Sequence, residues 1–394
     1  MHSKKICELE TKMIQVKKAM EAQGIYVALP QLEDLVGNVE AKKRNLEHKL
    51  KESFQINEDT NVNFNSSKDV SELLFTHFGI SPVTTRTGRP STNRRILRGI
   101  NNPITQRILD YRDLEQLLSS LKAIHTATNK ETSRITCTYI DDCPTGRLYT
   151  KDYSLQSIPE EARYVMHSDN LTTFVLADYS MFELRILSAL SHDTYFRFCW
   201  SQGLDLHRKV VADMKGISYE DVTDKQRRLG KALNFGISYG QEPFGLARNL
   251  NISVTEAESL MNEYKRNIPE IEAFKLEVVK KVRKSGFAET YYGRRRFIPD
   301  IISQDKAKRS KAERQAVNTK IQGSAADIVK FTLVKLHEEG FAINTMLHDA
   351  ILLTVKDESL DEDVKRIRSA MEIELEGMKL PVDIRTGKSW GECH

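Results

Sequence analysis

Residues 227–240 read RRLGKALNFGISYG, and this stretch decides how the rest of the chain is interpreted. Four of its side chains recur at intervals of four residues: Arg227, Lys231, Phe235 and Tyr239. Because an α-helix has about 3.6 residues per turn, this spacing puts all four on one helical face. Cations suit phosphate oxygens, and rings offer a flat surface for a base or a sugar. The pattern predicts a helix that holds a nucleoside triphosphate, although an amphipathic helix with a basic edge fits the spacing alone.

The composition of the chain excludes several classes of protein. Its 394 residues are 40% hydrophobic and 29% charged, enough for a sizeable core and two or three subdomains. No run of 18 apolar residues occurs and the first residues are charged, so we expect neither a membrane span nor a secretory signal. Five scattered cysteines without a CxxC pair favour a reducing, cytoplasmic setting over disulfides or a zinc site.

The positive charge of the chain is concentrated in clusters, although the net charge is only +4. The clusters are Lys42–Lys51, Arg86–Arg98, Arg294–Arg296 and Lys306–Arg314. Such runs are commonly solvated faces, but several in one chain permit a track for a polyanion.

The first 130 residues are predicted to be mostly helical. Arg86–Thr92 is a basic turn, and Thr92 is placed to cap a helix that begins at Asn93. Arg134–Ile140 then alternates and is rich in Thr, Ile and Tyr, which predicts a strand.

Two capping-box patterns mark helix starts further along the chain. Ser180–Glu183 has the S-x-x-E form and follows a short apolar strand that ends at Asp178. Thr223–Gln226 opens the helix with the four-residue spacing, and Gly236 and Gly240 near its end indicate a bend or a close approach. Asp178 is thus predicted to lie at a strand-to-helix junction.

A second acid, Asp349, follows an apolar run near the end of the chain. Ala342–Leu347 and Ile351–Val355 are predicted to form a hairpin with this acid at the turn. If one sheet brings Asp178 and Asp349 together, they could hold a pair of Mg²⁺ ions suited to in-line phosphoryl transfer. Each acid alone fits equally well as a turn or cap residue.

The chain resembles the polymerase region of family A DNA polymerases, the bacterial DNA polymerase I type. Leu176–Arg185 (LADYSMFELR) is similar to motif A, Arg227–Gly240 to motif B, and Leu347–Ala350 (LHDA) to motif C. Further similar segments are Arg86–Thr92, Tyr111–Arg112, Thr145–Leu148, Gly293–Arg296 and Ile321–Asp327. The segments follow the family's order from about residue 10 to the end.

The resemblance implies an α+β right-hand fold, with an antiparallel-sheet palm and a mainly helical thumb and fingers. The thumb would take residues 1–130, the palm 131–194 and 321–394, and the fingers 195–320. Because the thumb resemblance begins almost at the first residue, we expect no separate proofreading exonuclease domain.

The resemblance also assigns roles to individual residues. Asp178 and Asp349 would hold two Mg²⁺ ions, and Lys231 would also protonate the pyrophosphate. The nucleotide-binding set is Arg227, Lys231, Phe235, Tyr239, Glu183 and His207. The DNA-binding set is Arg147, Gln322, His348, Arg86, Arg185 and Arg294. Glu183 would block a 2′-hydroxyl, or act as the capping-box partner, or both.

Six positions depart from the family's pattern: Ala350, Met181, Phe182, Met346, Ser154 and Ser157. Ala350 stands where motif C usually has Glu, and Met181 and Met346 stand where Gln is usual. We expect template-directed DNA synthesis from deoxynucleoside triphosphates on a primer–template, by a monomer. Ala350 leaves open a non-catalytic DNA-binding protein on the same fold. A single-subunit RNA polymerase is a further alternative, against which Glu183 and the thumb resemblance argue.

Overall fold

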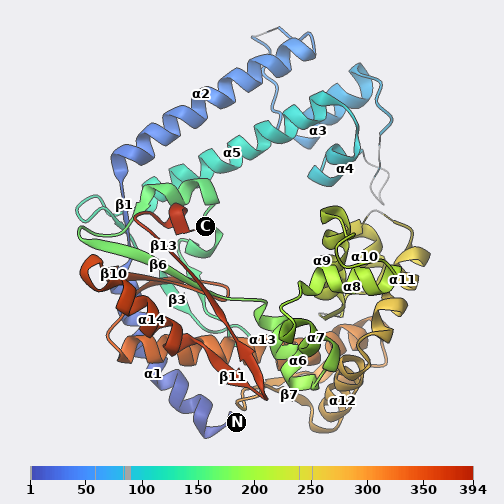
Figure 1. The fold of residues 1–394 in the computed structure, drawn as a ribbon. Coiled ribbons are helices and arrows are strands. Elements are labelled where there is room, and N and C mark those ends of the chain that lie inside the picture. The colour runs from blue at the N-terminus through green and yellow to red at the C-terminus, as the bar shows by residue number, and fades with distance from the viewer. Residues whose placement is uncertain are drawn as a thin grey trace. The chain divides into compact units, whose positions relative to one another are not determined.

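The computed structural model describes residues 2–57, 59–82, 84, 90–238, 240–250 and 252–393. Figure 1 shows its course, and the chain divides into two compact units. The larger unit contains Met1–Gln23, Cys137–Gln156 and Leu171–Thr386, and the smaller contains Gly24–Thr136, Ser157–Asn170 and Gly387–His394. The division into thumb, palm and fingers stays a prediction. Two candidate site residues, Arg86 and Tyr239, lie outside the described residues.

Two long helices form the frame of the smaller unit. α2 (Leu29–Ser53) packs along α5 (Pro103–Ala127), and a cluster of apolar side chains fills the space beside them. Its other elements are β1 (Ile25–Val27), α3 (Ser67–Ser71), the π-helix η1 (Glu72–His77), α4 (Arg94–Gly99), β2 (Arg134–Ile135), η3 (Glu160–Val165), β5 (Met166–His167) and η6 (Trp390–Cys393). The strands form a small sheet in the order β2-β1-β5.

Two local predictions in this part of the chain are wrong. Asn93, rather than Thr92, caps α4, because the Asn93 side chain accepts the backbone N–H of Ile96. The predicted strand Arg134–Ile140 is two strands, because β2 pairs with β1 in the smaller unit while β3 (Thr138–Ile140) pairs with β4 (Tyr149–Lys151) in the larger.

An antiparallel sheet forms the centre of the larger unit, in the order β13-β6-β10-β9 (Figure 1). Its strands are β6 (Thr172–Tyr179), β9 (Ala342–Leu347), β10 (Ala350–Lys356) and β13 (Val382–Gly387). The middle strands are apolar runs because helices pack on the sheet: α1 (Lys4–Gln23), α13 (Lys306–Glu338) and α14 (Leu360–Met371). The α+β class and the hairpin between β9 and β10 are confirmed.

Helices make up most of the rest of the larger unit. They are α6 (Phe182–Ser191), α7 (Thr194–Ser201), α8 (Leu206–Lys215), α9 (Asp224–Ser238), α10 (Pro243–Leu250), α11 (Val254–Arg266) and α12 (Pro269–Ser285). The remaining elements are η2 (Leu155–Ser157), β7 (Phe287–Glu289), β8 (Arg295–Phe297), η4 (Pro299–Ile302), η5 (Asp357–Ser359), β11 (Ile373–Leu375) and β12 (Met378–Leu380). Within the described parts of the chain, no helix has the length and apolar content needed to cross a membrane.

α8 and α9 pack unusually closely. A Cβ atom placed on Gly230 of α9 would lie 2.0 Å from the backbone oxygen of His207 in α8, so a larger residue would push the helices apart. The predicted capping box opens α9 as expected, because the Thr223 hydroxyl accepts the N–H of Gln226 and the Gln226 side chain accepts the N–H of Thr223. The helix ends at Ser238, and Gly240 follows with a positive φ of 71°.

Candidate active site

The two predicted acids come together at one end of the middle strands of the central sheet, where β6 ends and β10 begins. This end of the sheet, with Asp178 and Asp349, is called the acid edge below. Asp178 is the seventh residue of β6 and pairs in register with Ala350, the first residue of β10. Asp349 immediately precedes Ala350, in the two-residue loop that is closed by the pairing of Ala350 with Leu347. His348 takes a positive φ of 54° in this loop, as tight hairpins require. The pairing of β6 with β10 therefore brings Asp178 and Asp349 close together, which the sequence alone left open.

Asp349 lies in surroundings that disfavour its ionised form. Burial raises the pKa of Asp349 to about 7, the carboxylates of Glu183 and Asp178 add to the rise, and Arg147 opposes it. Within the described residues no hydrogen bond or ion pair engages the Asp349 carboxylate. A carboxyl held in this state favours a bound cation or a proton.

Asp178 has a related environment with different neighbours. Asp178 is exposed to solvent, but the protein around its carboxylate partly desolvates it and so raises its pKa. The Asp383 carboxylate adds to the rise. Arg385 and His348 act in the opposite direction. The sequence reasoning missed Asp383 and Arg385, although alternation along Val382–Gly387 predicts a strand with both on one face.

Glu183 joins several predicted site residues, but not as a capping-box partner. The capping-box prediction is wrong, because Met181 takes the cap position of α6 in a left-handed conformation with φ of 52° and no side-chain cap bond forms. The buried Glu183 carboxylate instead accepts hydrogen bonds from Arg147 and, at 3.5 Å, from Gln322. Glu183, Arg147 and Gln322 therefore form one connected group beside Asp349.

The two acids are compatible with a divalent metal ion that takes only part of its ligands from the protein. Among the residues that the structure describes, no group of three or more His, Cys, Asp or Glu side chains could hold a metal ion alone. Asp178 and Asp349 offer two hard carboxylate donors, and no ion pair or hydrogen bond within the part of the chain that the structure describes engages either carboxylate. Mg²⁺ commonly binds one or two carboxylates and completes its shell with waters and substrate phosphates, which this donor set allows.

The cationic end of α9 lies near the start of α8. Arg227 donates from Nε and Nη2 to Oδ2 of Asp205, at 2.9 and 2.6 Å. Lys231, one turn later, is exposed and has no ion-pair partner within the described residues. Sequence reasoning missed Asp205, and the available signal was an acidic residue at the position that caps α8.

His207 is held as a neutral, buried side chain behind Phe235. It is 2% exposed, its ring centroid lies 5.7 Å from that of Phe235, and burial lowers its pKa to about 4. Its Nδ1 is 2.7 Å from the side-chain amide of Asn234, whose oxygen accepts the hydroxyl of Tyr264 at 2.7 Å. His207 can therefore offer a hydrogen bond without a full positive charge.

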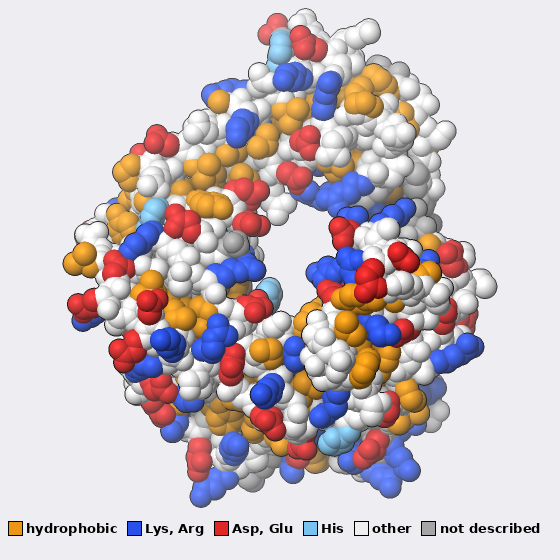
Figure 2. All heavy atoms as spheres, viewed as in Figure 1, with side chains coloured by type: hydrophobic (Ala, Val, Ile, Leu, Met, Phe, Trp, Pro, Cys, Tyr) orange, Lys and Arg blue, Asp and Glu red, His pale blue; other side chains and the backbone are white. Residues whose placement is uncertain are grey.

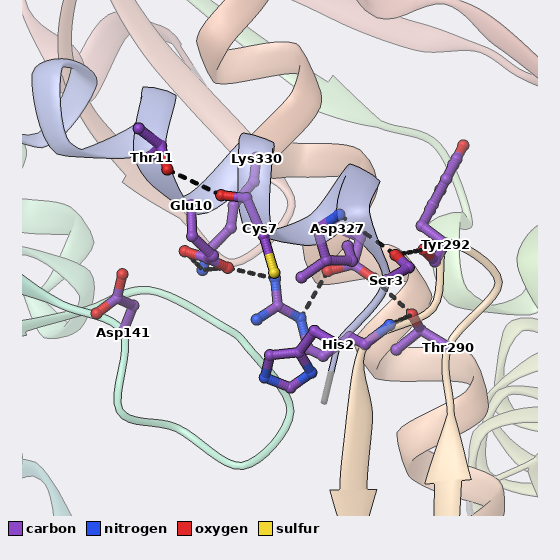
Figure 3. A network of polar contacts seen from close by, with 12 residues as sticks. His2, Ser3, Cys7, Glu10, Thr11, Asp141, Thr290, Tyr292, Asp327 and Lys330 are labelled. Carbon is purple, nitrogen blue, oxygen red and sulfur yellow. Dashed lines mark hydrogen bonds and ion pairs between the residues drawn. The ribbon is translucent and has the colours of Figure 1, made fainter.

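Arg294, assigned to DNA by the resemblance, lies in a network of charges with Glu10, Asp327 and Lys330, which are labelled in Figure 3. Its Nε donates to Asp327 at 2.7 Å, and its Nη2 donates to Glu10, which also accepts from Lys330 at 2.8 Å. Arg294 is 7% exposed and also lies against Gly146, where an added Cβ would be 2.4 Å from its Nε. These contacts make it part of the support beneath the turn that carries Arg147.

Arg185 is likewise engaged by its own unit. It donates to the backbone oxygens of Ser180 and Lys379 at 3.1 and 3.3 Å and stacks over the ring of Trp200. On the face drawn in Figure 2, Lys and Arg side chains are interspersed with Asp and Glu, which fits the small net charge.

Comparisons with known proteins agree with this geometry. The thermostable DNA polymerase I of Thermus filiformis is 32% identical and aligns with 98% of this chain and 48% of its own length. DNA polymerase I of Lactococcus lactis subsp. lactis (strain IL1403) is 35% identical, with 98% and 46% covered. The POL domain of Pol1 from M. smegmatis, solved in complex with DNA primer-template and dNTP, has a TM-score of 0.88 and 28% identity, with 98% of this chain and 70% of that chain covered.

This chain thus spans about half the length of the curated relatives it matches. The family model for DNA polymerase family A matches residues 30–392. The match includes the strands that carry both acids and the whole of α9. The chain belongs to DNA polymerase family A.

Proposed function

We propose that this chain performs template-directed DNA synthesis, adding deoxynucleotides to the 3′-hydroxyl of a primer. The primer oxygen would attack the α-phosphorus of the triphosphate, and the bond from that phosphorus to the leaving pyrophosphate would break. The observation that carries the proposal is that the register of β6 and β10, which pairs Asp178 with Ala350, brings Asp178 close to Asp349, whose pKa is raised to about 7. Membership of family A supports it.

Asp178 and Asp349 would hold the metal in this reaction, and we assign two Mg²⁺ ions to them. When bound, such ions lower the pKa of the attacking hydroxyl and neutralise charge on the leaving group. The protein's own contribution is a pair of carboxylates fixed by the register of β6 and β10.

The exposed face of α9 would hold the triphosphate. Arg227 and Lys231 of α9 would supply positive charge for the phosphate oxygens, and Lys231 would also give a proton to the departing pyrophosphate. The half-buried ring of Phe235 offers a surface for the incoming nucleotide, and neutral His207 lies behind it.

The Glu183 group would meet the sugar and the primer end. Glu183 is fixed by Arg147 and Gln322, so its carboxylate is a rigid obstacle to a 2′-hydroxyl. Arg147, Gln322 and His348 would contact the primer–template near the primer terminus, and Arg185 and Arg294 would support that surface. A DNA primer-template and a dNTP accompany the similar Pol1 domain. A cytoplasmic setting near the nucleoid, in a bacterium, phage or plasmid system, belongs to the same proposal.

One observation favours a second candidate, a catalytically weakened DNA-binding protein. Ala350 is only 8% exposed and lies directly opposite Asp178, at the position where the family resemblance places a glutamate. The chain thus has one fewer carboxylate at the edge than the motif provides.

Primer extension separates the two candidates. Purified protein is given a primer–template, all four dNTPs and Mg²⁺, and single-turnover extension is compared with that of Asp349→Asn as a blank. We expect extension by the natural sequence well above the blank. Extension no faster than the blank, together with synthesis restored by Ala350→Glu, would favour the DNA-binding protein.

A further inference from the structure

Asp205 serves two helices with its two carboxylate oxygens. Oδ1 accepts the backbone N–H of Arg208 at 2.8 Å and so caps the N-terminus of α8. Oδ2 accepts Nε and Nη2 of Arg227 at 2.9 and 2.6 Å, on α9. One carboxylate therefore ties the backbone of one helix to a candidate triphosphate-binding side chain on the next.

The surroundings fix Asp205 in place. The Asp205 N–H donates to the hydroxyl of Tyr219 at 3.0 Å, and Arg208 donates to the backbone oxygen of Val222 and to Asp224 at the start of α9. α9 packs closely against α8 at Gly230, where an added Cβ atom would lie 2.0 Å from the His207 backbone oxygen. Because Asp205 is held by backbone bonds, its Oδ2 is a fixed anchor for Arg227.

Charge supports the same arrangement. Burial alone would raise the pKa of Asp205, but hydrogen bonds from Arg227 and from the Arg208 backbone hold it below its ordinary value. The hydrogen bonds that Arg227 donates to Asp205 in turn raise the pKa of Arg227. Both groups are ionised at neutral pH.

The pairing leaves part of the Arg227 guanidinium available. Nε and Nη2 are directed to Asp205, whereas no contact within the described residues engages Nη1. An arginine held on one edge presents its remaining donors in a defined direction and loses less freedom when it binds phosphate.

Resting on the proposed function, we propose that Asp205 is a positioning residue that aims Arg227 at the phosphate groups of the incoming nucleotide. Two other roles would use the same contacts. Asp205 would merely cap α8, or it would compete with the triphosphate for Arg227. The three roles predict different effects of substitution on nucleotide affinity.

Two substitutions at Asp205 separate capping from positioning. Asp205→Asn keeps an oxygen that can cap α8 but loses the charged acceptor for Arg227, and Asp205→Ser caps but is too short to reach it. Asp305 offers a matched control, because it caps α13 through the N–H groups of Ala307 and Lys308 and is exposed. Asp305→Asn reports the effect of changing a cap alone.

The readout is the dissociation constant of the matching dNTP from a complex with a dideoxy-terminated primer–template, in which no chemistry occurs. Asp205→Asn and Asp205→Ser should each weaken dNTP binding about tenfold, with thermal stability and primer–template affinity close to those of the natural sequence. Asp305→Asn should leave dNTP binding unchanged.

A double-mutant cycle shows whether Asp205 acts through Arg227. Arg227→Ala should weaken dNTP binding, and adding Asp205→Asn to it should have no further effect. Weakening by Arg227→Ala without weakening by either Asp205 variant would overturn the inference and leave the proposed function intact. Tighter binding by Asp205→Asn would also overturn it and identify competition. A natural sequence that neither binds dNTP nor extends a primer would overturn both proposals.

Discussion

Two carboxylates of the larger unit, Asp349 and Asp205, have pKa values that the fold shifts in opposite directions. Asp349 is partly buried beside other acids, and its pKa rises to about 7. Asp205 is partly buried too, but Arg227 and the Arg208 N–H hold its pKa below the ordinary value. No ion pair within the described residues engages the Asp349 carboxylate, whereas the Asp205 carboxylate is paired with Arg227.

This difference indicates which of the two carboxylates is suited to bind a cation. A paired acid such as Asp205 stabilises its surroundings and directs its partner. An uncompensated acid such as Asp349 costs free energy when ionised, and that cost is recovered only when a cation arrives. The following predictions test the contrast, from the largest expected effect to the smallest.

The largest effect should come from removing a charge at the acid edge. Asp178→Asn should reduce single-turnover extension by about three orders of magnitude or more, because the charge acts on the transition state through bound metal. Primer–template affinity, measured by fluorescence anisotropy, should change little because phosphate contacts dominate it.

Asp383 provides the matched control for this prediction. It is exposed on β13 and raises the pKa of Asp178 without lying in the predicted acid pair. Asp383→Asn should slow extension less than about tenfold. Equal losses in the two variants would mean that Asp178 acts only through the summed charge of the edge.

A smaller effect is expected from breaking the group centred on Glu183. Glu183→Ala should increase ribonucleotide incorporation relative to deoxyribonucleotide by about 10–100-fold, because it removes the carboxylate that Arg147 and Gln322 hold rigid. Competition between the two nucleotides on one template measures the ratio.

Gln322→Ala tests whether Glu183 needs both supports. It removes the weaker contact, at 3.5 Å, and leaves Arg147 in place. We expect a change in sugar selection of less than about tenfold. Unaltered selection in Glu183→Ala would show that Glu183 does not face the 2′ position.

Local sequence signals predicted the parts of the site that depend on neighbours in the chain. The apolar runs, the hairpin and the Thr223 capping box are confirmed because each is decided within a few residues. The S-x-x-E pattern at Ser180 failed because Met181 adopts a left-handed backbone and the Glu183 carboxylate is bound by Arg147, 36 residues earlier.

Tertiary partners decided the rest. Arg294 lies in a concentrated cationic turn in the sequence, yet it is buried by Asp327 and by Glu10, which is 284 residues away. Asp205 and Asp383 were missed because a cap position and a strand position carry no sign of the side chains that fold against them. Such long-range pairings are absent from any local pattern.

His207, which lies two residues after Asp205, and Asp349 should have opposite effects on stability when the pH falls. The unfolded His207 imidazole has a pKa near 6.5, whereas the folded one is lowered to about 4 by burial. The unfolded state therefore binds more protons between these values, and stability is lost as the pH falls from about 6.5 to about 4. Asp349 has the opposite sign, because its folded pKa is raised and protonation favours the folded state.

Urea unfolding at pH 7 and pH 4.5 measures how much the free energy of unfolding changes between these pH values. His207→Asn should remove about 2 kcal/mol of the acid-induced loss in free energy of unfolding. Asp349→Asn, without divalent cation, should make that loss larger, because it removes a group that gains stability on acidification. Parallel changes in the two variants would contradict the assignment of opposite signs.

The smallest catalytic effect is expected at Ala350. A glutamate here would lie opposite Asp178 and next to Asp349, adding a third carboxylate where two pKa values are already raised. Ala350→Glu should therefore lower the melting temperature without Mg²⁺, and saturating Mg²⁺ should restore most of it.

Ala350→Gln has nearly the same volume without the charge and separates electrostatics from packing. Ala350 is 8% exposed and Met346 is 4% exposed, so either longer side chain must displace apolar neighbours. If charge dominates, only the glutamate variant will show a stability that depends on Mg²⁺; equal destabilisation of both, unaffected by Mg²⁺, would instead indicate crowding. Extension by Ala350→Glu should differ from the natural rate by less than about tenfold, since Asp178 and Asp349 remain in register and a carboxylate outside the metal pair acts only by orienting water or the primer end. A larger gain would mean that the natural edge is one ligand short.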